Sequence, residues 1–322
     1  MLKSLIVCAL VVSFSLALVL FLFPGHTLAQ AVKFGTSVKM SPAYYLPVMA
    51  AEEKGFWKEQ GLKVEWVPFR GAAPMMRSVA AGHINIGGST AAGLLLPMSR
   101  GVPVVLVAEM VKRFDWFIIV RAASPVRKPE DLKGLKVGVV VLGSVEDAYG
   151  KTPLKALGLE KQIKFVSVGG IRQKYAALRS GAIKAIVASG TVAVRSVLQG
   201  KARAIVKIND YLPKKWMEHS IFARKDFIKN QPETTKKVVN AVLASINFVT
   251  GNPSWTIGKL QSESNYSREV AQAALKHFEF TKDGKINRDV IANLRNFAIK
   301  NGIVSGQDMP PVDNLFTRQF TD

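Results

Sequence analysis

Cysteine is nearly absent from this sequence. The 322 residues include one, Cys8, which follows three large apolar residues inside an apolar run, so we interpret it as an apolar side chain and not as a lipid-attachment site. The rest of the chain has no thiol. Disulfides, thiolate catalysis and thiolate-bound metal are excluded there, and stability must come from packed apolar cores.

Sequence motifs for catalysis are missing as well. Beyond residue 31 there are three histidines, His83, His219 and His277, and none has another histidine or a carboxylate at the spacing of a metal motif. A Gly-x-Ser-x-Gly elbow, a phosphate loop and a Gly-x-Gly-x-x-Gly fingerprint are also absent. We therefore expect no enzymatic activity, no metal and no cofactor, although a hydrolase triad assembled from distant residues would leave no such pattern.

Acidic residues are scarce, with 23 Asp and Glu against 44 Lys and Arg, which gives a net charge of +21 at pH 7. The basic residues are spread along the whole chain, without an arginine-rich tail and without clustering beside aromatic residues. This pattern predicts a solvated basic surface and no nucleic-acid partner. On an exported protein such a surface would also favour contact with anionic membrane lipids.

The N-terminus has the order of a secretory signal. A single charge, Lys3, precedes an apolar run over residues 5–23, which is followed by a Pro-Gly break and by small residues around Ala31. We predict a signal peptide over residues 1–31, cleaved near Ala31, and a periplasmic protein. Because the apolar run is longer than a usual signal core, an uncleaved membrane anchor is the alternative.

Strand and helix signals then alternate. Alternating residues predict strands over 32–36 and 62–67, and a continuous apolar run predicts a buried strand over 102–108. Pro and Gly delimit helices over 47–55 and 74–82. A short strand over 84–86 leads to a helix that starts near Ser89 and Thr90. This alternation predicts helices that cover a largely parallel sheet.

A second unit of the same kind follows, and from residue 232 the alternation gives way to helices. Strand-like segments at 116–121 and 220–224 flank the second unit as the two crossings of a hinge. We predict an α/β protein of two lobes. Residues 32–117 and 219–322 form the first lobe, on which the C-terminal helices pack, and residues 118–218 form the second.

Small or hydroxylated residues follow several strands where a helix begins. In an α/β sheet such loops gather at the carboxyl ends of the strands, where ligands bind, and the free N–H groups of a helix start favour anionic groups. Ordinary helix capping would explain any one of these positions. The candidate ligand-binding residues at helix starts are Ser89, Thr90, Ser144, Ser189 and Thr191.

Further candidates lie beside the same edge. Met40, Ser41 and Tyr44 belong to the loop expected after the first strand, and Trp116 begins a hinge strand. Arg70 falls near a strand end and could pair with an anion, as could Arg113 and Arg172.

Two carboxylates beside these candidates are evidence against an anionic ligand. Glu146 and Asp147 lie close to Ser144, and unless they are turned away as capping groups they favour a cationic or zwitterionic ligand.

Residues 47–64 hold an Ala-x-Glu-x-Gly-Phe-Trp-x-x-x-Gly-Leu-x-Val pattern when written from Ala51 onward, and residues 82–87, 101–104 and 131–138 add shorter motifs. Together these resemble the solute-binding proteins of ABC importers for nitrate, sulfonates, taurine and thiamine pyrimidines, over residues 32–248. The resemblance implies the type II periplasmic-binding fold, with two α/β lobes joined by a two-strand hinge, a ligand between the lobes and an ABC permease in the inner membrane as partner.

The leading hypothesis is therefore a monomeric receptor that captures a small polar or anionic solute. One alternative is an enzyme like the family's pyrimidine synthases, which depend on a cysteine-rich motif that this chain lacks. Another is a membrane-tethered solute sensor.

Overall fold

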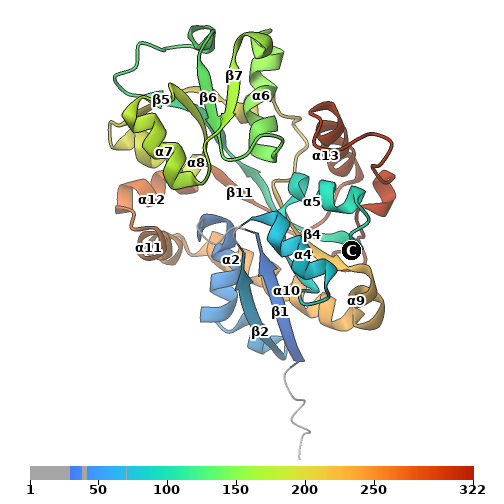
Figure 1. Ribbon diagram of the computed structural model, residues 1–322. Helices are drawn as coiled ribbons and strands as arrows, with labels where there is room; N and C mark the ends of the chain where they lie inside the picture. Colours follow the sequence, from blue (N-terminus) through green and yellow to red (C-terminus); the bar gives the residue numbers. More distant parts are fainter. Residues whose placement is uncertain (1–29, 38–41, 70) are drawn as a thin grey trace, which may run out of the picture.

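The computed structural model describes residues 30–37, 42–69 and 71–322. Within them the chain forms two α/β lobes (Figure 1), each built on one mixed sheet. The first lobe has a six-stranded sheet in the order β11-β4-β10-β3-β1-β2. Its strands are β1 (Gln30–Thr36), β2 (Leu62–Pro68), β3 (Ile86–Thr90), β4 (Val104–Phe114), β10 (His219–Arg224) and β11 (Phe278–Phe280).

The second lobe has a five-stranded sheet in the order β7-β6-β8-β5-β9. Its strands are β5 (Trp116–Arg121), β6 (Lys136–Val139), β7 (Lys164–Ser167), β8 (Ala185–Ser189) and β9 (Ala202–Lys207), and its helices are α6 (Val145–Ala156), α7 (Ile171–Ser180) and α8 (Gly190–Leu198). The α/β class and the two lobes predicted from the sequence are confirmed, but the expectation of largely parallel sheets is wrong. In each lobe three neighbouring strands pair in parallel, β2-β1-β3 and β7-β6-β8, whereas the pairs made by β10, β4, β11, β5 and β9 are antiparallel.

Helices cover both faces of the first sheet. The helices outside the second lobe are α2 (Pro42–Glu53), α3 (Phe56–Glu59), α4 (Ala72–Ala80), α5 (Ala91–Ser99), α9 (Lys225–Asn230), α10 (Pro232–Gly251), α11 (Pro253–Ser264), α12 (Arg268–Leu275) and α13 (Arg288–Lys300). One of them departs from the expectation that the C-terminal helices pack on the first lobe, because α12 packs against α8 of the second lobe. The guanidinium of Arg195 on α8 lies 5.5 Å from the ring centroid of Tyr266, just before α12.

The first predicted helix begins earlier than residue 47. Helix α2 starts at Pro42, and a non-helical residue, Tyr45, breaks it two residues before Pro47. The break explains why the sequence indicated a start there, since proline is tolerated in the first turn of a helical segment. The predicted signal or anchor segment lies outside the described residues as far as residue 29. Among the helices that are described, none is long and apolar enough to span a membrane.

The chain passes between the sheets twice, at Asp115 and over residues 208–218. Each of the two expected hinge strands belongs to one sheet: β5 pairs with β8 and β9, and β10 pairs with β3 and β4. The proposed lobe boundary after residue 117 falls inside β5, so the change of sheet comes two residues earlier. Buried apolar side chains of both lobes form one continuous cluster, which includes Leu94 of α5, Val187 of β8 and Phe297 of α13.

The first crossing is fixed by the buried carboxylate of Asp115, whose side chain is 2% exposed. It accepts hydrogen bonds from Lys207 of β9 at 3.0 Å and from His277, which precedes β11, at 2.9 Å. Burial alone would raise the pKa of Asp115, but the bonds from His277 and Lys207 outweigh it and lower that pKa below its ordinary value. The backbone carbonyl of Asp115 also accepts the N–H of Gly190 at 2.7 Å.

Beside the second crossing, the core of the first lobe encloses polar groups that lack partners. His219 of β10 is 0% exposed and stacks on Tyr44 of α2, with ring centroids 4.0 Å apart. Neither ring nitrogen of His219 nor the hydroxyl of Tyr44 has a hydrogen-bond partner among the described residues. Burial therefore lowers the pKa of His219 to about 3.

Asp115→Ala is expected to reduce the free energy of unfolding by about 3 kcal/mol, because Lys207 and His277 would be left at the crossing without their acceptor. Urea denaturation measures this. The control is Asp226→Ala, which removes the half-exposed partner of Arg224 and should cost about 0–1 kcal/mol. Equal losses in the two variants would contradict the role given to Asp115.

His219→Gln is expected to weaken the dependence of stability on pH. The unfolded chain protonates His219 below about pH 6.5, whereas the folded chain does so only near pH 3, so the stability linked to neutral His219 is lost as pH falls below about 6.5. Between pH 7.5 and pH 5 the wild type should lose about 2 kcal/mol that the variant does not lose.

Denaturation at the two pH values measures this difference, and His83→Gln, at an exposed position, is the control. Burial raises the pKa of Glu109 and of Glu218 to about 7, which acts in the opposite direction but equally in wild type and variant. An unchanged pH dependence in His219→Gln would show that His219 is solvated in solution.

Candidate functional site

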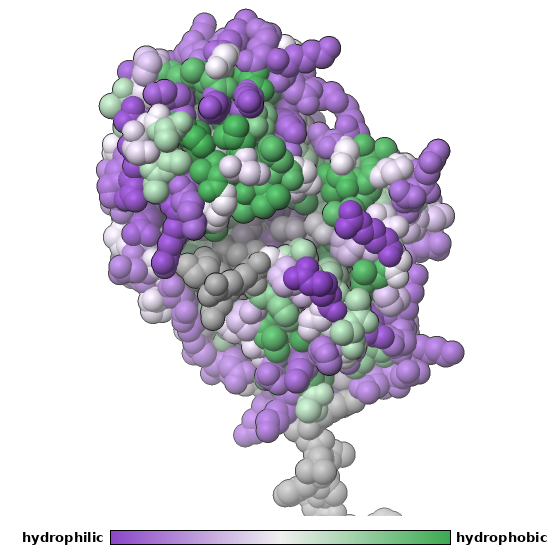
Figure 2. Space-filling view, viewed as in Figure 1, coloured by the Kyte–Doolittle hydropathy of each residue, from purple (hydrophilic) through white to green (hydrophobic). Residues whose placement is uncertain are grey.

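A cavity of about 860 Å³ lies between the two lobes. Helices α4 and α5 of the first lobe form one wall, and the loop from β6 to α6 in the second lobe forms the other. Figure 2 shows the surface hollowed between the two lobes, with apolar residues gathered on the second lobe above the hollow. The position matches the expected site, because the cavity opens at the carboxyl ends of β3 and β6.

The walls are mainly apolar. The first lobe contributes one face of α4 and one face of α5 to the wall of the cavity, and the second lobe contributes residues 140–145. Val141 and Leu142 are 55% and 48% exposed, which is unusual for large apolar residues unless something covers them. The apolar lining residues are Ala72, Ala73, Met76, Ala80, Leu96, Pro97, Val102, Val140, Val141, Leu142, Val145 and Ile303.

Positive electrostatic groups surround this apolar space. The first turns of α4, α5 and α6 all contribute to the lining, through Ala72, Gly93 and Val145, so three helix N-termini meet at the cavity. Arg77 in the last turn of α4 and Arg100 at the end of α5 also line it. Both arginines are exposed, and neither forms an ion pair within the described part of the chain.

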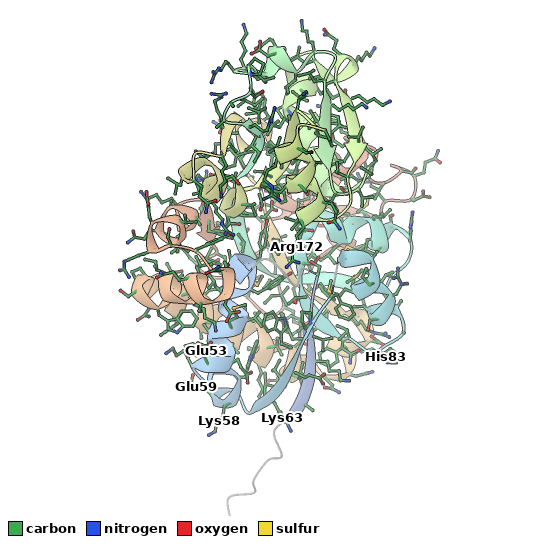
Figure 3. All side chains as sticks on the ribbon, turned by 60° about the vertical axis from the view of Figure 1, so that its left-hand side comes forward. Glu53, Lys58, Glu59, Lys63, His83 and Arg172 are labelled. Atoms are coloured by element: carbon green, nitrogen blue, oxygen red, sulfur yellow. The ribbon has the colours of Figure 1, made fainter. Side chains whose placement is uncertain are left out.

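A third arginine, Arg172, belongs to the second lobe but is not among the residues that line the cavity. Figure 3 shows Arg172, in the first turn of α7, at the junction between the lobes, whereas His83 lies at the edge of the first lobe. Arg113, the other arginine considered as an anion partner, belongs to β4 and does not line this cavity. Its Nε lies 3.7 Å from Asp115 Oδ1 and 4.0 Å from Glu279 Oε2.

The two carboxylates that favoured a cationic ligand are engaged within the second lobe. Glu146 lines the cavity, but it pairs with the buried ammonium of Lys174 at 2.6 Å and accepts the N–H of Val140 at 3.0 Å. Asp147 accepts the N–H of Gly143 at 2.8 Å and pairs with Lys151 at 2.7 Å. Each carboxylate is thus paired with a lysine of the second lobe, although Asp147 Oδ1 has no hydrogen-bond partner among the described residues.

Three of the predicted site residues meet at the cavity. Thr90 precedes the first residue of α5, Ser144 caps α6 by accepting the N–H of Asp147 at 3.3 Å, and half-buried Trp116 begins β5. The Ser144 hydroxyl donates to the carbonyl of Val141 at 2.7 Å. Ser144 therefore shapes the loop that walls the cavity.

The other predicted residues lie apart from the cavity lining. Tyr44 is buried against His219, and Ser89 is buried in β3, where its hydroxyl donates to Ser37 at 2.9 Å. Ser189 precedes α8 and Thr191 is buried in that helix, which packs on α12. Met40, Ser41 and Arg70 fall outside the described residues, so their assignment to the site stays a prediction.

Behind Trp116 lies a group that the sequence did not indicate. Glu218, the last residue of the second crossing, is 1% exposed and accepts hydrogen bonds from Trp116 Nε1 at 3.1 Å, Tyr149 Oη at 2.7 Å and Trp216 Nε1 at 3.4 Å. Trp116 and Tyr149 both line the cavity. Burial raises the pKa of Glu218 to about 7, although all three donors lower it.

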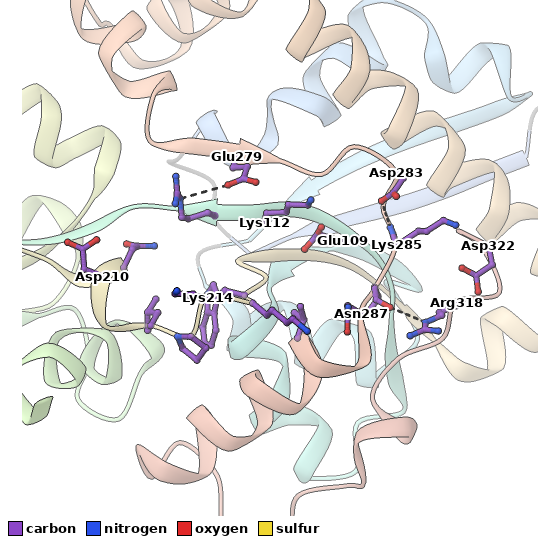
Figure 4. A pocket seen from close by; sticks show the side chains of 18 residues that line it. Glu109, Lys112, Asp210, Lys214, Glu279, Asp283, Lys285, Asn287, Arg318 and Asp322 are labelled. Atoms are coloured by element: carbon purple, nitrogen blue, oxygen red, sulfur yellow. Dashed lines mark hydrogen bonds and ion pairs between the residues drawn. The ribbon is translucent and has the colours of Figure 1, made fainter.

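A second and larger cavity, of about 1090 Å³, lies on the first lobe beside β4, β11 and the second crossing. Figure 4 shows that charges of both signs alternate around it and that several are already satisfied, such as the pair Arg113–Glu279. Buried Glu109 of β4 is among its lining residues. This surface lacks the apolar walls of the interlobe cavity, so we assign the candidate site to the latter. No cluster of residues suited to a metal ion occurs among the described residues.

Comparison with known proteins agrees with this architecture. A family model described as NMT1/THI5 like matches residues 43–255. A candidate binding protein of Brucella abortus is 23% identical over 253 residues, which cover 74% of this chain and 76% of that protein. A 4-amino-5-hydroxymethyl-2-methylpyrimidine phosphate synthase of Saccharomyces cerevisiae is 21% identical over 241 residues, 65% of this chain and 64% of the synthase.

Among solved structures, the periplasmic aliphatic sulphonate binding protein of Escherichia coli superposes with a TM-score of 0.75 at 17% identity, covering 90% of this chain and 92% of that one. This likeness confirms the type II periplasmic-binding fold. The family model covers well over half of the chain, and it confirms the resemblance seen in the sequence motifs. The chain therefore belongs to the NMT1/THI5-like family.

Proposed function

We propose that this protein is the solute-binding component of an ABC importer, exported to the periplasm, and that it closes its lobes around a small organic anion with an apolar body. The observation that carries the proposal is the interlobe cavity, which combines apolar walls with three helix N-termini and with Arg77 and Arg100. An apolar body would occupy the walls, and an anionic group would lie toward the positive groups.

The size of the cavity is consistent with such a ligand. Small-molecule sites are typically about 300–1,000 Å³, so 860 Å³ accommodates a solute larger than nitrate. Nitrate would fill little of the space and would contact few of the apolar residues. We therefore favour sulfonates or carboxylates with an alkyl or aryl group over the inorganic anion.

Transport would follow from closure. A solute that contacts both lobes stabilises the closed state by its differential affinity for that state, and the closed pair of lobes is the form that the permease would recognise. The similarity to binding proteins of the same fold supports this order of events.

Similarity to the yeast synthase raises an enzymatic alternative. The synthases that the sequence motifs resemble depend on a cysteine-rich motif, whereas Cys8 is the one cysteine in these 322 residues. We therefore favour a receptor. A membrane-tethered sensor would instead retain residues 1–31, and the intact mass of the protein recovered from cells tests that.

A thermal-shift screen identifies the ligand class. The panel contains alkyl and aryl sulfonates, aromatic carboxylates, nitrate, pyrimidines and polyamines. A ligand present at 100 times its Kd stabilises the folded state by about 2.7 kcal/mol, so sulfonates or carboxylates with apolar groups should raise the Tm and polyamines should not. A response to polyamines alone would overturn the assignment of an anion.

The double variant Arg77→Gln and Arg100→Gln is expected to raise the Kd of the anion found in the screen about tenfold or more, because each lost guanidinium removes a charge-assisted contact. Isothermal titration calorimetry measures this. The matched control is Arg127→Gln with Arg179→Gln, which removes the same charge from exposed positions of the second lobe outside the cavity lining. Equal weakening in both double variants would indicate a general charge effect instead of contact at the cavity.

A further inference from the structure

Glu218 is attached to both lobes at once. Its backbone belongs to the first lobe, since its N–H donates to the carbonyl of Val111 in β4 at 2.9 Å and its own carbonyl accepts the N–H of Ala91 in α5 at 2.9 Å. Its carboxylate bonds to the second lobe, through Trp116 of β5 and Tyr149 of α6. One side chain therefore connects the sheet of the first lobe to two side chains that line the cavity from the second.

Among the described residues, no cation pairs with the carboxylate of Glu218. Its hydrogen bonds within the described residues all come from neutral groups, the hydroxyl of Tyr149 and the indoles of Trp116 and Trp216. The other titratable groups beside it, Tyr44 of α2 and the adjacent His219 of β10, are buried and neutral at pH 7. The negative charge of Glu218 thus depends on donors that two lobes supply together.

The two donors from the second lobe, Trp116 and Tyr149, line the cavity and pack on neighbouring aromatic rings. The rings of Trp116 and Tyr149 contact each other, with centroids 5.5 Å apart, and Tyr149 packs on Trp216 and Phe297 of the first lobe's core. Separation of the lobes at this point would move Trp116 and Tyr149 away from Glu218. The carboxylate would then exchange two protein donors for water.

We propose that Glu218 is a positioning residue that couples solute occupancy of the interlobe cavity to lobe closure, by accepting hydrogen bonds from Trp116 and Tyr149 only when the lobes are together. The coupling to solute rests on the proposed function, whereas the effect on lobe separation does not. A solute that packs on Trp116 and Tyr149 holds both donors against Glu218, so binding energy and the hydrogen bonds favour the same closed state.

The proposal has a pH signature. With the lobes together, burial outweighs the three donors and favours the protonated carboxyl, whereas a carboxylate exposed to water by lobe separation has its ordinary pKa. Because the closed state therefore takes up a proton, acidification from pH 8 to pH 6 should favour closure and lower the Kd of the solute. Neutral variants of Glu218 should lack this dependence.

The test uses Glu218→Gln, with Glu109→Gln as the matched control. Glu109 is also a buried carboxylate whose pKa burial raises to about 7, but it lies in β4 beside the larger cavity and away from the interlobe site. Glu218→Gln should raise the Kd of the solute about tenfold at pH 8 and flatten the change of Kd between pH 8 and pH 6. Glu109→Gln should leave both unchanged.

Lobe separation is measured without solute in the full-length chain. Replacing Cys8 by Ser leaves no cysteine, so Lys58→Cys in the first lobe and Lys133→Cys in the second provide two specific sites for spin labels. Pulsed electron paramagnetic resonance should show a larger population of wide separations in Glu218→Gln than in wild type or Glu109→Gln. Tyr149→Phe, which leaves the carboxylate in place, should shift the same population, and the effects of the two substitutions should be less than additive.

Two failures can be told apart. If the wild-type protein binds no solute of the panel but Glu218→Gln widens the lobe separation, the proposed function fails and the closure role of Glu218 stands. If solute binds and neither Glu218→Gln nor Tyr149→Phe changes the separation, the Kd or its pH dependence, the inference about Glu218 is overturned and the proposed function stands.

Discussion

The arrangement of the two lobes depends on two buried carboxylates, one at each place where the chain passes between the sheets. Asp115 at the first crossing is compensated by Lys207 and His277, so removing it from water is offset by charge-assisted hydrogen bonds. Glu218 at the second crossing is held by neutral donors alone within the described residues. The ion pair and the histidine contact at Asp115 therefore fix the first crossing. The neutral hydrogen bonds to Glu218 at the second crossing would change with the position of the lobes.

The cavity follows from this geometry. With the lobes together, the faces of α4 and α5 lie opposite the loop from β6 to α6, and apolar walls meet beneath three helix N-termini. The polar side chains of that loop are engaged in holding it: Ser144 caps α6, Glu146 pairs with Lys174 and Asp147 pairs with Lys151. Glu146 and Asp147 also accept the N–H groups of Val140 and Gly143, so the proposed anion would meet the first turns of the helices and the exposed arginines Arg77 and Arg100.

Local signals in the sequence predicted the parts of the site that local physics determines. Ser144 and Thr90, which line the cavity, were predicted because helix caps and strand ends have short-range patterns. Tyr149 and Glu218 were missed because a buried carboxylate that is bonded across 69 residues leaves no spacing to read. The parallel sheets were over-predicted for a related reason, since β10 and β5 return from the other lobe, and their direction is set by the crossings rather than by their own residues.

Adjacent residues at the second crossing respond to burial in opposite ways. Burial lowers the pKa of His219 to about 3 and raises that of Glu218 to about 7, because in each case the charged form is the one that loses water. His219 therefore cannot supply the cation that Glu218 lacks, although it is the next residue in the chain. Three donors, Trp116, Tyr149 and Trp216, point at Glu218, and two of them belong to the lobe that would have to move. Because burial raises the pKa of Glu218, its protonation and the closure of the cavity are coupled, and a proton and a solute each favour the closed state.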